Sequence, residues 1–549
     1  MNEYDPVTLE ILWERLITIV DEGAVSLRNT AFSLLVREGN DFAVVLTDPE
    51  GNAVAQNRAC LPNFAGTIPP TVRYVVQKFR NTWRPGDVVI MNDPWISAGH
   101  VNDLSIVTPI FGEEGVAGFA ANSAHSADIG GLRFGGRGRD MYEEGLRIPA
   151  AKLYTAGEQN SLLYEVIKEN VRLPEQVIGD IESQVSANET AGRKLKELLK
   201  EFEIKDLHSL AAAILSRSEA VVRDTIRDVR DGTWSHEVKM DGIDEPLTIR
   251  ATVTIKGSDI HVDYTGTSRQ VEFPLNSVSN YTYAYTVYPV RTALCPGIPN
   301  NDGALRPITV SAPPGTILNP LPPAPVAQRH LLGHFCAGAV YGALAQVVPE
   351  KVIAECGSTP STTFAIAGER ADGSRFGEIV FVAGGMGARP TMDGLSCVTF
   401  PANVAASPVE VLENTLPIRY EEKEYIPDSG GQGEYRGGLG ARHRFRIVSS
   451  KPVWLSALVD RTKFAAQGLL GGEPGSLLTL GVEPPKAIPP KDYILLQPGD
   501  VVTIELPGGG GYGNLLSQGG LICFRQPKKK EDTKLFDGSS MKSSLKRSC

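Results

Sequence analysis

Two polar stretches in the first quarter of the chain carry side chains that could hold a metal ion. They are residues 91–111, "MNDPWISAGHVNDLSIVTPIF", and residues 116–131, "VAGFAANSAHSADIGG". Together they contain His100 and His125, two of the eight histidines in 549 residues. Imidazole and carboxylate groups are common ligands of transition metals. The presence of Asp103 near the two histidines in the sequence therefore indicates metal chemistry.

The pattern around these residues predicts a hairpin. Residues 104–111 and 116–125 read as two strands joined by the turn 112–115. Folding the chain about that turn places Asp103 nearly opposite His125. Opposed residues of an antiparallel pair lie close enough to share an ion.

His100 can join this pair only if the chain bends. It lies three residues before Asp103, and on a straight strand the two side chains would point to opposite faces. Gly99 makes a bend easy. Two histidines and one carboxylate leave coordination positions free for water or substrate, and such a site can lower the pKa of water or polarise a carbonyl. Candidates for a fourth ligand or a supporting partner are Asp41, Asp93 and Asp128. The alternative is a hydrogen-bonded polar loop without a metal.

Further charged residues follow the histidines. The stretch "MYEEGLRIPAAKLY", residues 141–154, contains Glu143, Glu144 and Arg147. These are either solvated charges or a carboxylate and a guanidinium that face the site. On the second interpretation, Glu144 and Arg147 are candidate catalytic residues.

Two other patterns are weaker indications of function. His330 and His334 are four residues apart on an expected helix, which favours a core or interface role over a second metal site. Gly508, Gly510 and Gly513 match the spacing of a dinucleotide-binding loop, but no convincing helix follows them, so we expect a tight glycine turn. The sequence also has no GxxxxGK[ST] loop for ATP.

The elements that must position these residues predict an α+β fold. Helical periodicity begins at Pro6 and recurs over residues 174–231, whereas alternating patterns indicate strands elsewhere. We expect a metal-bearing N-terminal α/β region (1–173), a helical connector (174–232), a β-rich middle region (233–330), a Gly-rich mixed or β C-terminal region (331–514), and a disordered or aberrant basic tail (515–549).

Composition narrows the class of partner. The net charge of −10 argues against nucleic acid or an anionic membrane, because both require a basic face. No apolar run is long enough to span a membrane, and the first residues do not resemble a secretory signal. Seven scattered cysteines without a CxxC pair predict free thiols in a reducing cytoplasm.

Many of these segments, in this order, resemble the hydantoinase B/oxoprolinase family. The resemblance covers about residues 5–514 and rests on "DPVTLEIL", "REGNDFAVVL", "MNDPWISAGHVNDLSIVTPIF", "AHSADIGG", "EGLRIPAAKLY", "DYTGTSRQ", "GGMGARPTMDG", "PDSGGQGEYRGGLG" and "GGGGYGN". The family includes the B subunit of N-methylhydantoinase, the C-terminal half of 5-oxoprolinase, and subunits of caprolactamase and of acetone and acetophenone carboxylases.

The resemblance implies a B-type subunit in a hetero-oligomer with a hydantoinase A-type subunit, which binds ATP and Mg. That partner would phosphorylate the carbonyl or enol oxygen of a small substrate. Zn or Mn would occupy the place of His100, Asp103 and His125, and Asp41 matches an aspartate of the same site in lactam-opening members. Activated water would then open a cyclic amide. The alternatives are a subunit of an ATP-dependent ketone carboxylase and a non-catalytic assembly subunit.

The chain departs from the family in two places. Many members have a histidine-bearing stretch where this chain reads "CLPNFAGTIP", residues 60–69. The surroundings of the substrate are therefore expected to differ. Members also usually continue past "GGGGYG" with a helical end, which is replaced here by the basic tail.

Overall fold

The structure is a computed structural model that describes residues 4–135, 137–489 and 491–515. It combines helices with four separate sheets, which confirms the predicted α+β class. Apart from residue 515, the predicted tail lies outside the described residues. Within the described part, no helix is long and apolar enough to cross a membrane. Five cysteines fall in this part, and all are free thiols, as predicted: Cys60, Cys295, Cys336, Cys356 and Cys397.

The first sheet has seven strands, and the strands at its centre are buried on both faces. Its order is β2-β1-β5-β4-β3-β6-β7, and all neighbours are antiparallel. The strands are β1 (Phe42–Thr47), β2 (Ala53–Gln56), β3 (Val88–Met91), β4 (Asp103–Phe111), β5 (Val116–His125), β6 (Ala151–Thr155) and β7 (Glu158–Gln159). The hairpin β4–β5 is the one expected from the sequence.

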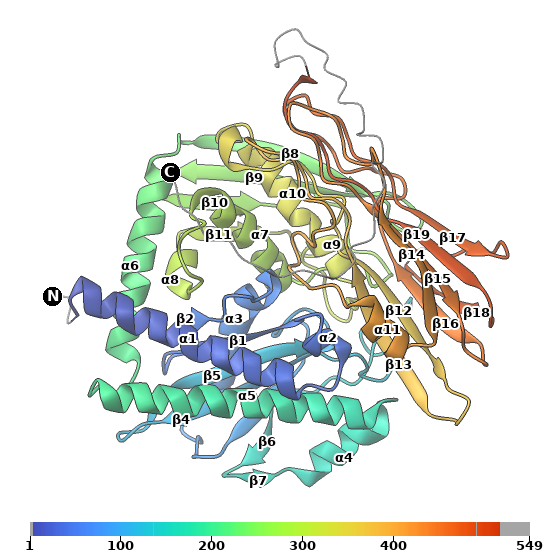
Figure 1. Cartoon of the computed structure of the whole chain (residues 1–549). Coiled ribbons are helices and arrows are strands. Elements are labelled where there is room, and N and C mark those ends of the chain that lie inside the picture. Colours follow the sequence, from blue (N-terminus) through green and yellow to red (C-terminus); the bar gives the residue numbers. More distant parts are fainter. Residues whose placement is uncertain (1–3, 136, 490, 516–549) are drawn as a thin grey trace, which may run out of the picture.

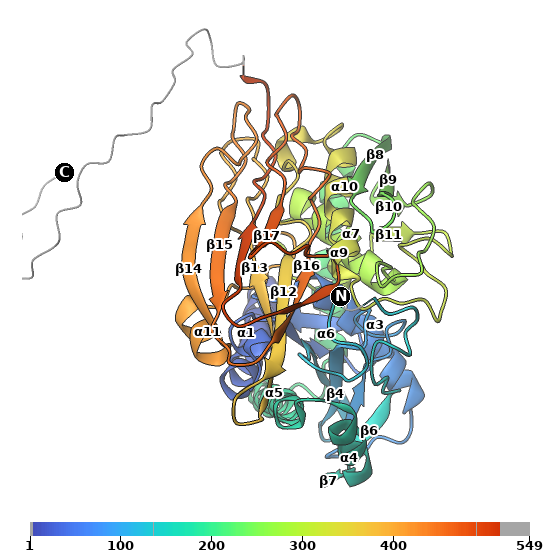
Figure 2. The same cartoon turned by 90° about the vertical axis from the view of Figure 1, so that its right-hand side faces the viewer.

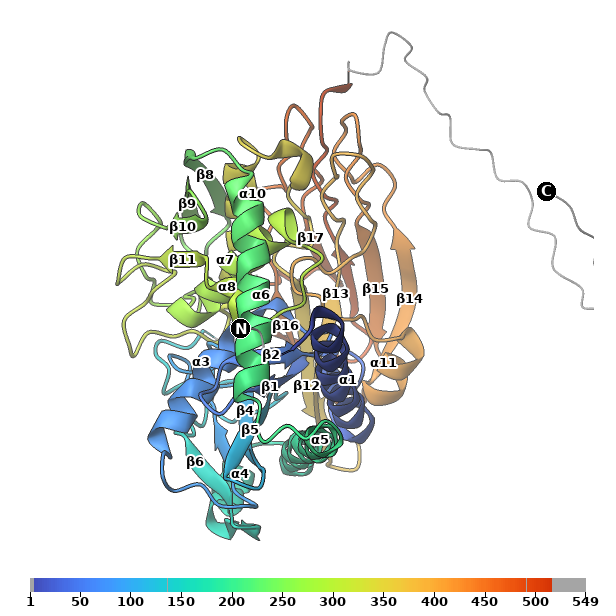
Figure 3. The ribbon, with the colours of Figure 1, turned by 90° about the vertical axis from the view of Figure 1, so that its left-hand side faces the viewer.

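Helices cover both faces of this sheet (Figure 1). They are α1 (Pro6–Thr30), α2 (Leu34–Arg37), α3 (Pro62–Lys78), α4 (Ser161–Asn170), α5 (Pro174–Glu201) and α6 (His208–Arg227). Val44 and Leu46 of β1 pack in one core with α1 and α5, whereas Ala43 and Val45 pack with α3 on the other side. Because successive side chains of a strand point to opposite faces, β1 contributes to two separate cores. Residues 174–232, expected as a connector, form α5 against this sheet and α6, which runs on to the middle region (Figure 3).

The middle region is a four-stranded sheet with helices on one face. Its order is β11-β10-β9-β8, with β8 (Gly232–Met240), β9 (Leu247–Lys256), β10 (Asp259–Asp263) and β11 (Ile308–Ser311). The accompanying helices are α7 (Ser279–Leu294), α8 (Asp302–Leu305), α9 (His330–Gly333), α10 (Phe335–Leu344) and the short 3-10 helix Pro349–Lys351. The hairpin at residues 256–259 and the buried helix after residue 330 agree with the sequence patterns.

The C-terminal region contains two four-stranded sheets with a shared core (Figure 2). One has the order β13-β12-β16-β18 and the other β14-β15-β19-β17. Their elements are β12 (Thr362–Glu369), β13 (Arg375–Val382), α11 (Val409–Thr415), β14 (Ile418–Tyr425), β15 (Ala441–Ile447), β16 (Val453–Leu458), β17 (Thr479–Glu483), β18 (Tyr493–Leu496) and β19 (Val501–Glu505). Phe364 and Phe445 stack between the sheets with ring centroids 5.3 Å apart.

The glycines near residue 510 allow several chain segments to pack closely against one another. Backbone hydrogen bonds join Gly509 to Gly438 and Gly385 to Pro507. A Cβ on Gly508 would lie 2.0 Å from the Ser429 carbonyl oxygen. These glycines therefore allow neighbouring loops to approach one another. The expected tight turn is wrong for residues 507–511, which form no turn and instead bond to distant loops.

One glycine decides how closely the N-terminal and middle regions pack. Gly66 of α3 faces α7, where an added Cβ would lie 2.6 Å from the Ala284 Cβ. Helix propensity alone would favour alanine by up to ~1 kcal/mol. We nevertheless expect Gly66→Ala to lower the free energy of unfolding by about 1–3 kcal/mol, because the helices must move apart.

Urea unfolding measures this effect. The matched control is Gly481→Ala, where an added Cβ meets nothing within 4 Å. It should stay within about 0.5 kcal/mol of the parent chain. Equal stabilities of the two variants would show that the contact between α3 and α7 is not tight.

Candidate metal centre

The hairpin β4–β5 brings the first two candidate ligands together. Asp103 is the direct partner of His125 in the antiparallel register, as the sequence predicted. The distance from His125 Nδ1 to Asp103 Oδ1 is 3.2 Å. The predicted bend is also present, because Gly99 has φ +98°. It lets His100 Nε2 lie 2.8 Å from the same Asp103 oxygen.

These three side chains form a compact and buried set of donors. One ligand atom from each of His100, Asp103 and His125 lies within 4.8 Å of the others. His100 and Asp103 have no exposed surface, and His125 is 6% exposed. Within the part of the chain that the structure describes, no other group of three such side chains converges in this way.

Asp41 lies beside this group, at the start of β1. Its Oδ2 is 3.7 Å from His125 Nδ1, and its backbone carbonyl accepts a hydrogen bond from the His125 backbone N–H. Burial raises the pKa of Asp41 to about 6. Asp41 thus lies beside His125 but outside the group of three convergent donors, and its use as a ligand stays a prediction.

Arg329 completes the electrostatics of the site, and sequence reasoning missed it. Its Nη2 donates to Asp103 Oδ2, its Nε donates to the Ala98 carbonyl at 2.8 Å, and its guanidinium lies 4.1 Å from the Tyr281 ring centroid. Burial would raise the pKa of Asp103, but His100 and Arg329 outweigh it and hold that pKa well below the usual range. No motif marks Arg329, since it lies in a Pro-rich stretch 226 residues away.

A second layer of hydrogen bonds orients His100. His100 Nδ1 lies 2.9 Å from the Ala327 carbonyl oxygen, which leaves Nε2 directed at Asp103. Glu144 Oε1 in turn accepts the backbone N–H groups of Val326 at 2.6 Å and Ala327 at 2.7 Å. Glu144 therefore acts on the site through the backbone that holds His100, and it touches none of the four candidate ligands.

Three other candidates lie elsewhere. Arg147 is 43% exposed and pairs with Asp93, 3.4 Å away. Asp128 pairs with Arg172 at 2.9 Å. Neither Asp93 nor Asp128 belongs to the convergent group of His100, Asp103 and His125. Their use as a fourth ligand or supporting partner stays a prediction. Arg147 could meet a substrate only at the surface beside Asp93.

A small cavity adjoins the candidate ligands. It has a volume of about 40 Å³, and its lining includes Asp41, His125, Phe134, His330 and His334. Both His330 and His334 are buried, as expected for core residues, and the Phe134 ring stacks on His330 with centroids 5.9 Å apart. Burial lowers the pKa of His334 to about 3. His330 and His334 are therefore core residues that also line the cavity beside the candidate ligands.

The donor set fits a divalent transition-metal ion. The Nε2 of His125 is buried and has no hydrogen-bond partner. A buried nitrogen of this kind costs free energy unless something binds it. Two imidazoles and one or two carboxylates are a ligand set that suits Zn²⁺ and Mn²⁺.

Glu144 makes a testable contribution to the pH dependence of stability. Burial raises its pKa from 4.5 to about 8. Between these values the folded chain keeps a proton that the unfolded chain has released. Stability should therefore fall as pH rises through this window, by up to about 1.4 kcal/mol per pH unit. Glu144→Gln cannot ionise, so this part of the slope should vanish.

Urea unfolding at several pH values, in the presence of a chelator, tests this prediction. The difference between the parent chain and Glu144→Gln isolates the one carboxyl group from all other titrations. Asp140→Asn should keep this slope and lower the upper end of the pH window slightly, because burial is the main cause of the raised pKa of Glu144 and the charge of Asp140 only adds to it. Parallel profiles for the parent and Glu144→Gln would contradict the assignment.

The fold and the site together define a class: a mixed α/β chain with a two-histidine, one-carboxylate cluster at the end of an antiparallel hairpin. The chain belongs to the hydantoinase B/oxoprolinase family, whose model matches residues 5–515. This confirms the resemblance seen in the sequence motifs.

Individual relatives span several named enzymes. The chain is 30% identical to the B-type subunit of a putative D-/L-hydantoinase of Pseudomonas sp. (strain NS671), over 96% of this chain and 92% of that protein. It is 26% identical to the 5-oxoprolinase of Dictyostelium discoideum, over 93% of this chain and 40% of that longer protein.

Solved structures share the architecture. An ATP-dependent caprolactamase from Pseudomonas jessenii superposes with a TM-score of 0.84 at 26% identity, over 93% of this chain and 92% of that one. A nucleotide-free acetone carboxylase superposes with a TM-score of 0.85 at 18% identity, over 93% of this chain and 76% of that one. The second likeness shows the fold alone.

Proposed function

We propose that this chain is the metal-bearing B-type subunit of an ATP-dependent hydrolase that opens cyclic amides, such as hydantoins, 5-oxoproline or lactams. The observation that carries the proposal is the buried convergence of His100, Asp103 and His125. The names of the relatives support it, because they include a hydantoinase subunit, 5-oxoprolinases and a caprolactamase.

The ligands in this proposal are His100, Asp103, His125 and Asp41, and the ion is Zn²⁺ or Mn²⁺. A bound divalent ion supplies positive charge that polarises a carbonyl and eases the ionisation of water. The chain itself supplies orientation. Arg329 holds Asp103 as a carboxylate, and the Ala327 carbonyl fixes the ring of His100, so that both groups are preorganised.

The proposed reaction needs an activated substrate, because an amide is a poor electrophile. An A-type partner that binds ATP and Mg would transfer the γ-phosphoryl group to the amide oxygen and leave ADP. Water adds to the activated carbon, the ring C–N bond breaks, and the nitrogen takes up a proton. Hydrolysis of the resulting acyl phosphate releases phosphate. One ring is opened for each ATP, with two waters consumed.

The size of the inner cavity bears on where the ring binds. A volume of about 40 Å³ is far below the ~300–1,000 Å³ of small-molecule sites, so the inner cavity is too small for a substrate ring. Phe134 and Ile379 line this cavity and also an outer cavity of about 470 Å³. The outer cavity is large enough for a small-molecule substrate. A ring held there would face the metal centre across Phe134.

Reconstitution with a hydantoinase A-type subunit tests the proposed function. Hydantoin, 5-oxoproline and caprolactam are offered with ATP, and ring-opened product and ADP are measured together. Stoichiometric ring opening and ADP formation that require both subunits would support the proposal. Bicarbonate-dependent consumption of acetone or acetophenone would instead select a ketone carboxylase. A complex that assembles without metal and without turnover would identify an assembly subunit.

A further inference from the structure

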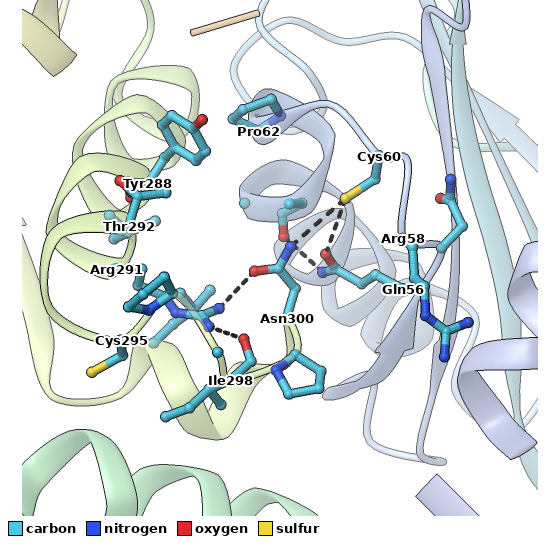
Figure 4. A pocket seen from close by; sticks show the side chains of 18 of the residues that line it. Gln56, Arg58, Cys60, Pro62, Tyr288, Arg291, Thr292, Cys295, Ile298 and Asn300 are labelled. Carbon is cyan, nitrogen blue, oxygen red and sulfur yellow. Dashed lines mark hydrogen bonds between the residues drawn. The ribbon is translucent and has the colours of Figure 1, made fainter. Parts of the chain in front are cut away.

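A second cavity, separate from the metal centre, lies between α3, α7 and the loop of residues 295–300 (Figure 4). Its volume is about 450 Å³, within the range of small-molecule sites. None of its lining residues lines the cavity beside the metal ligands. It therefore needs an explanation of its own.

The unusual group in this cavity is Arg291, a buried cation without an acidic partner. The residue is 6% exposed. Its Nη1 donates to Asn300 Oδ1 at 2.6 Å, its Nη2 donates to the Ile298 carbonyl, and its Nε has no partner. Among the described residues, no carboxylate forms an ion pair with Arg291. Burial lowers the pKa of its guanidinium, because removing a charged group from water costs free energy.

The neighbouring groups do not neutralise the charge. Cys60 and Cys295 lie close by, but burial raises the pKa of the Cys60 thiol to about 11 and also raises that of Cys295. Glu14 lines the cavity, but it pairs with Arg58. An arginine buried in this way usually has a bound anion or a carboxylate as its partner.

A chain of hydrogen bonds holds Asn300 in place against the arginine. Asn300 Nδ2 lies 3.7 Å from Cys60 Sγ, which lies 4.0 Å from Gln56 Oε1. Gln56 Nε2 donates to the Ala65 carbonyl at 2.9 Å. The amide oxygen of Asn300 is thereby turned to Arg291, and the guanidinium is fixed while several of its N–H groups stay available.

We propose that this cavity binds a small organic carboxylate, which pairs with Arg291 while its apolar body packs against Tyr288, Pro62 and Ile298. The planar fork of a guanidinium matches a carboxylate, and the pair would satisfy the buried charge. A carboxylate fits better than a phosphate group, because the only other cation in the lining is Arg58, which two carboxylates already hold.

Two chain segments contribute different residues to this cavity and to the cavity beside the metal ligands. Cys60 and Pro62 line it, whereas the intervening Leu61 and the next residue, Asn63, line the cavity beside His125. On α7, Arg291 belongs to this cavity and Tyr281 to the other. A carboxylate bound here would restrain both segments that enclose the metal centre, which is the arrangement of an effector site.

Calorimetric titration of the full chain with benzoate tests the proposal. Benzamide is the neutral analogue of nearly the same shape. We expect saturable binding of one benzoate per chain, with affinity lower by about tenfold or more in Arg291→Met and for benzamide. The control Arg58→Met should change the affinity by less than about threefold, because this rim arginine is exposed and held by Glu14 and Asp21. Hydrogen exchange should slow in residues 56–66 and in α7.

Equal affinities for benzoate and benzamide, unaltered affinity in Arg291→Met, or no saturable binding up to about 10 mM would overturn the proposal. Protection confined to other segments would overturn it as well. If Arg291→Met does not fold, the comparison of benzoate with benzamide on the parent chain still shows whether binding requires a carboxylate. These measurements use neither ATP, partner nor metal, so their outcome is independent of the proposed function.

Discussion

Replacement of both His100 and His125 by alanine is expected to lower the metal content of the purified chain from about one equivalent to nearly none, and ring opening by about a thousandfold or more. The physical reason is the loss of both nitrogen donors. Asp103 and Asp41 alone offer two carboxylates, which bind a transition metal weakly and without fixed geometry.

Plasma mass spectrometry measures the metal content of this double variant. The matched control is His208→Ala/His261→Ala, which removes two exposed histidines and should leave the metal content unchanged. Thermal unfolding checks that the variant is folded. A folded double variant that keeps its full metal content would refute the assigned ligands, whereas absence of metal from the parent chain would favour the assembly subunit.

Arg329→Met should have the second large effect, and on stability first. Arg329 and Asp103 are 3% and 0% exposed, so the substitution leaves a buried carboxylate without its charged partner. Breaking a buried pair in this way costs about 3–5 kcal/mol of folding stability. The pKa of Asp103 should rise, since Arg329 is one of the charges that keep it low. Metal affinity should fall by about 10–100-fold.

Urea unfolding with a chelator and metal titration of the folded chain give the two readouts. Arg193→Met is the control, because Arg193 is 62% exposed and pairs with Glu197 on the same helix. It should alter stability by less than about 0.5 kcal/mol. If Arg329→Met proved as stable as the control, the pairing of Arg329 with Asp103 would not be a structural requirement.

The sequence by itself determined the local part of the site. The turn at residues 112–115 and the two strands around it set the register, and the register alone places Asp103 opposite His125. Gly99 marks the bend that turns His100 to the same point. Such features are readable because strand alternation and turn chemistry act over a few residues. The motifs also identified the family.

Only the tertiary structure decided what surrounds the ligands. Arg329 and Ala327 come from a segment more than two hundred residues away, and nothing in their neighbourhood marks them as partners of Asp103 and His100. The same holds for the pairing of Asp128 with Arg172, which no local pattern predicts. The physical reason is that burial and charge pairing depend on which segments the packed cores bring together, and short-range sequence patterns do not encode that choice.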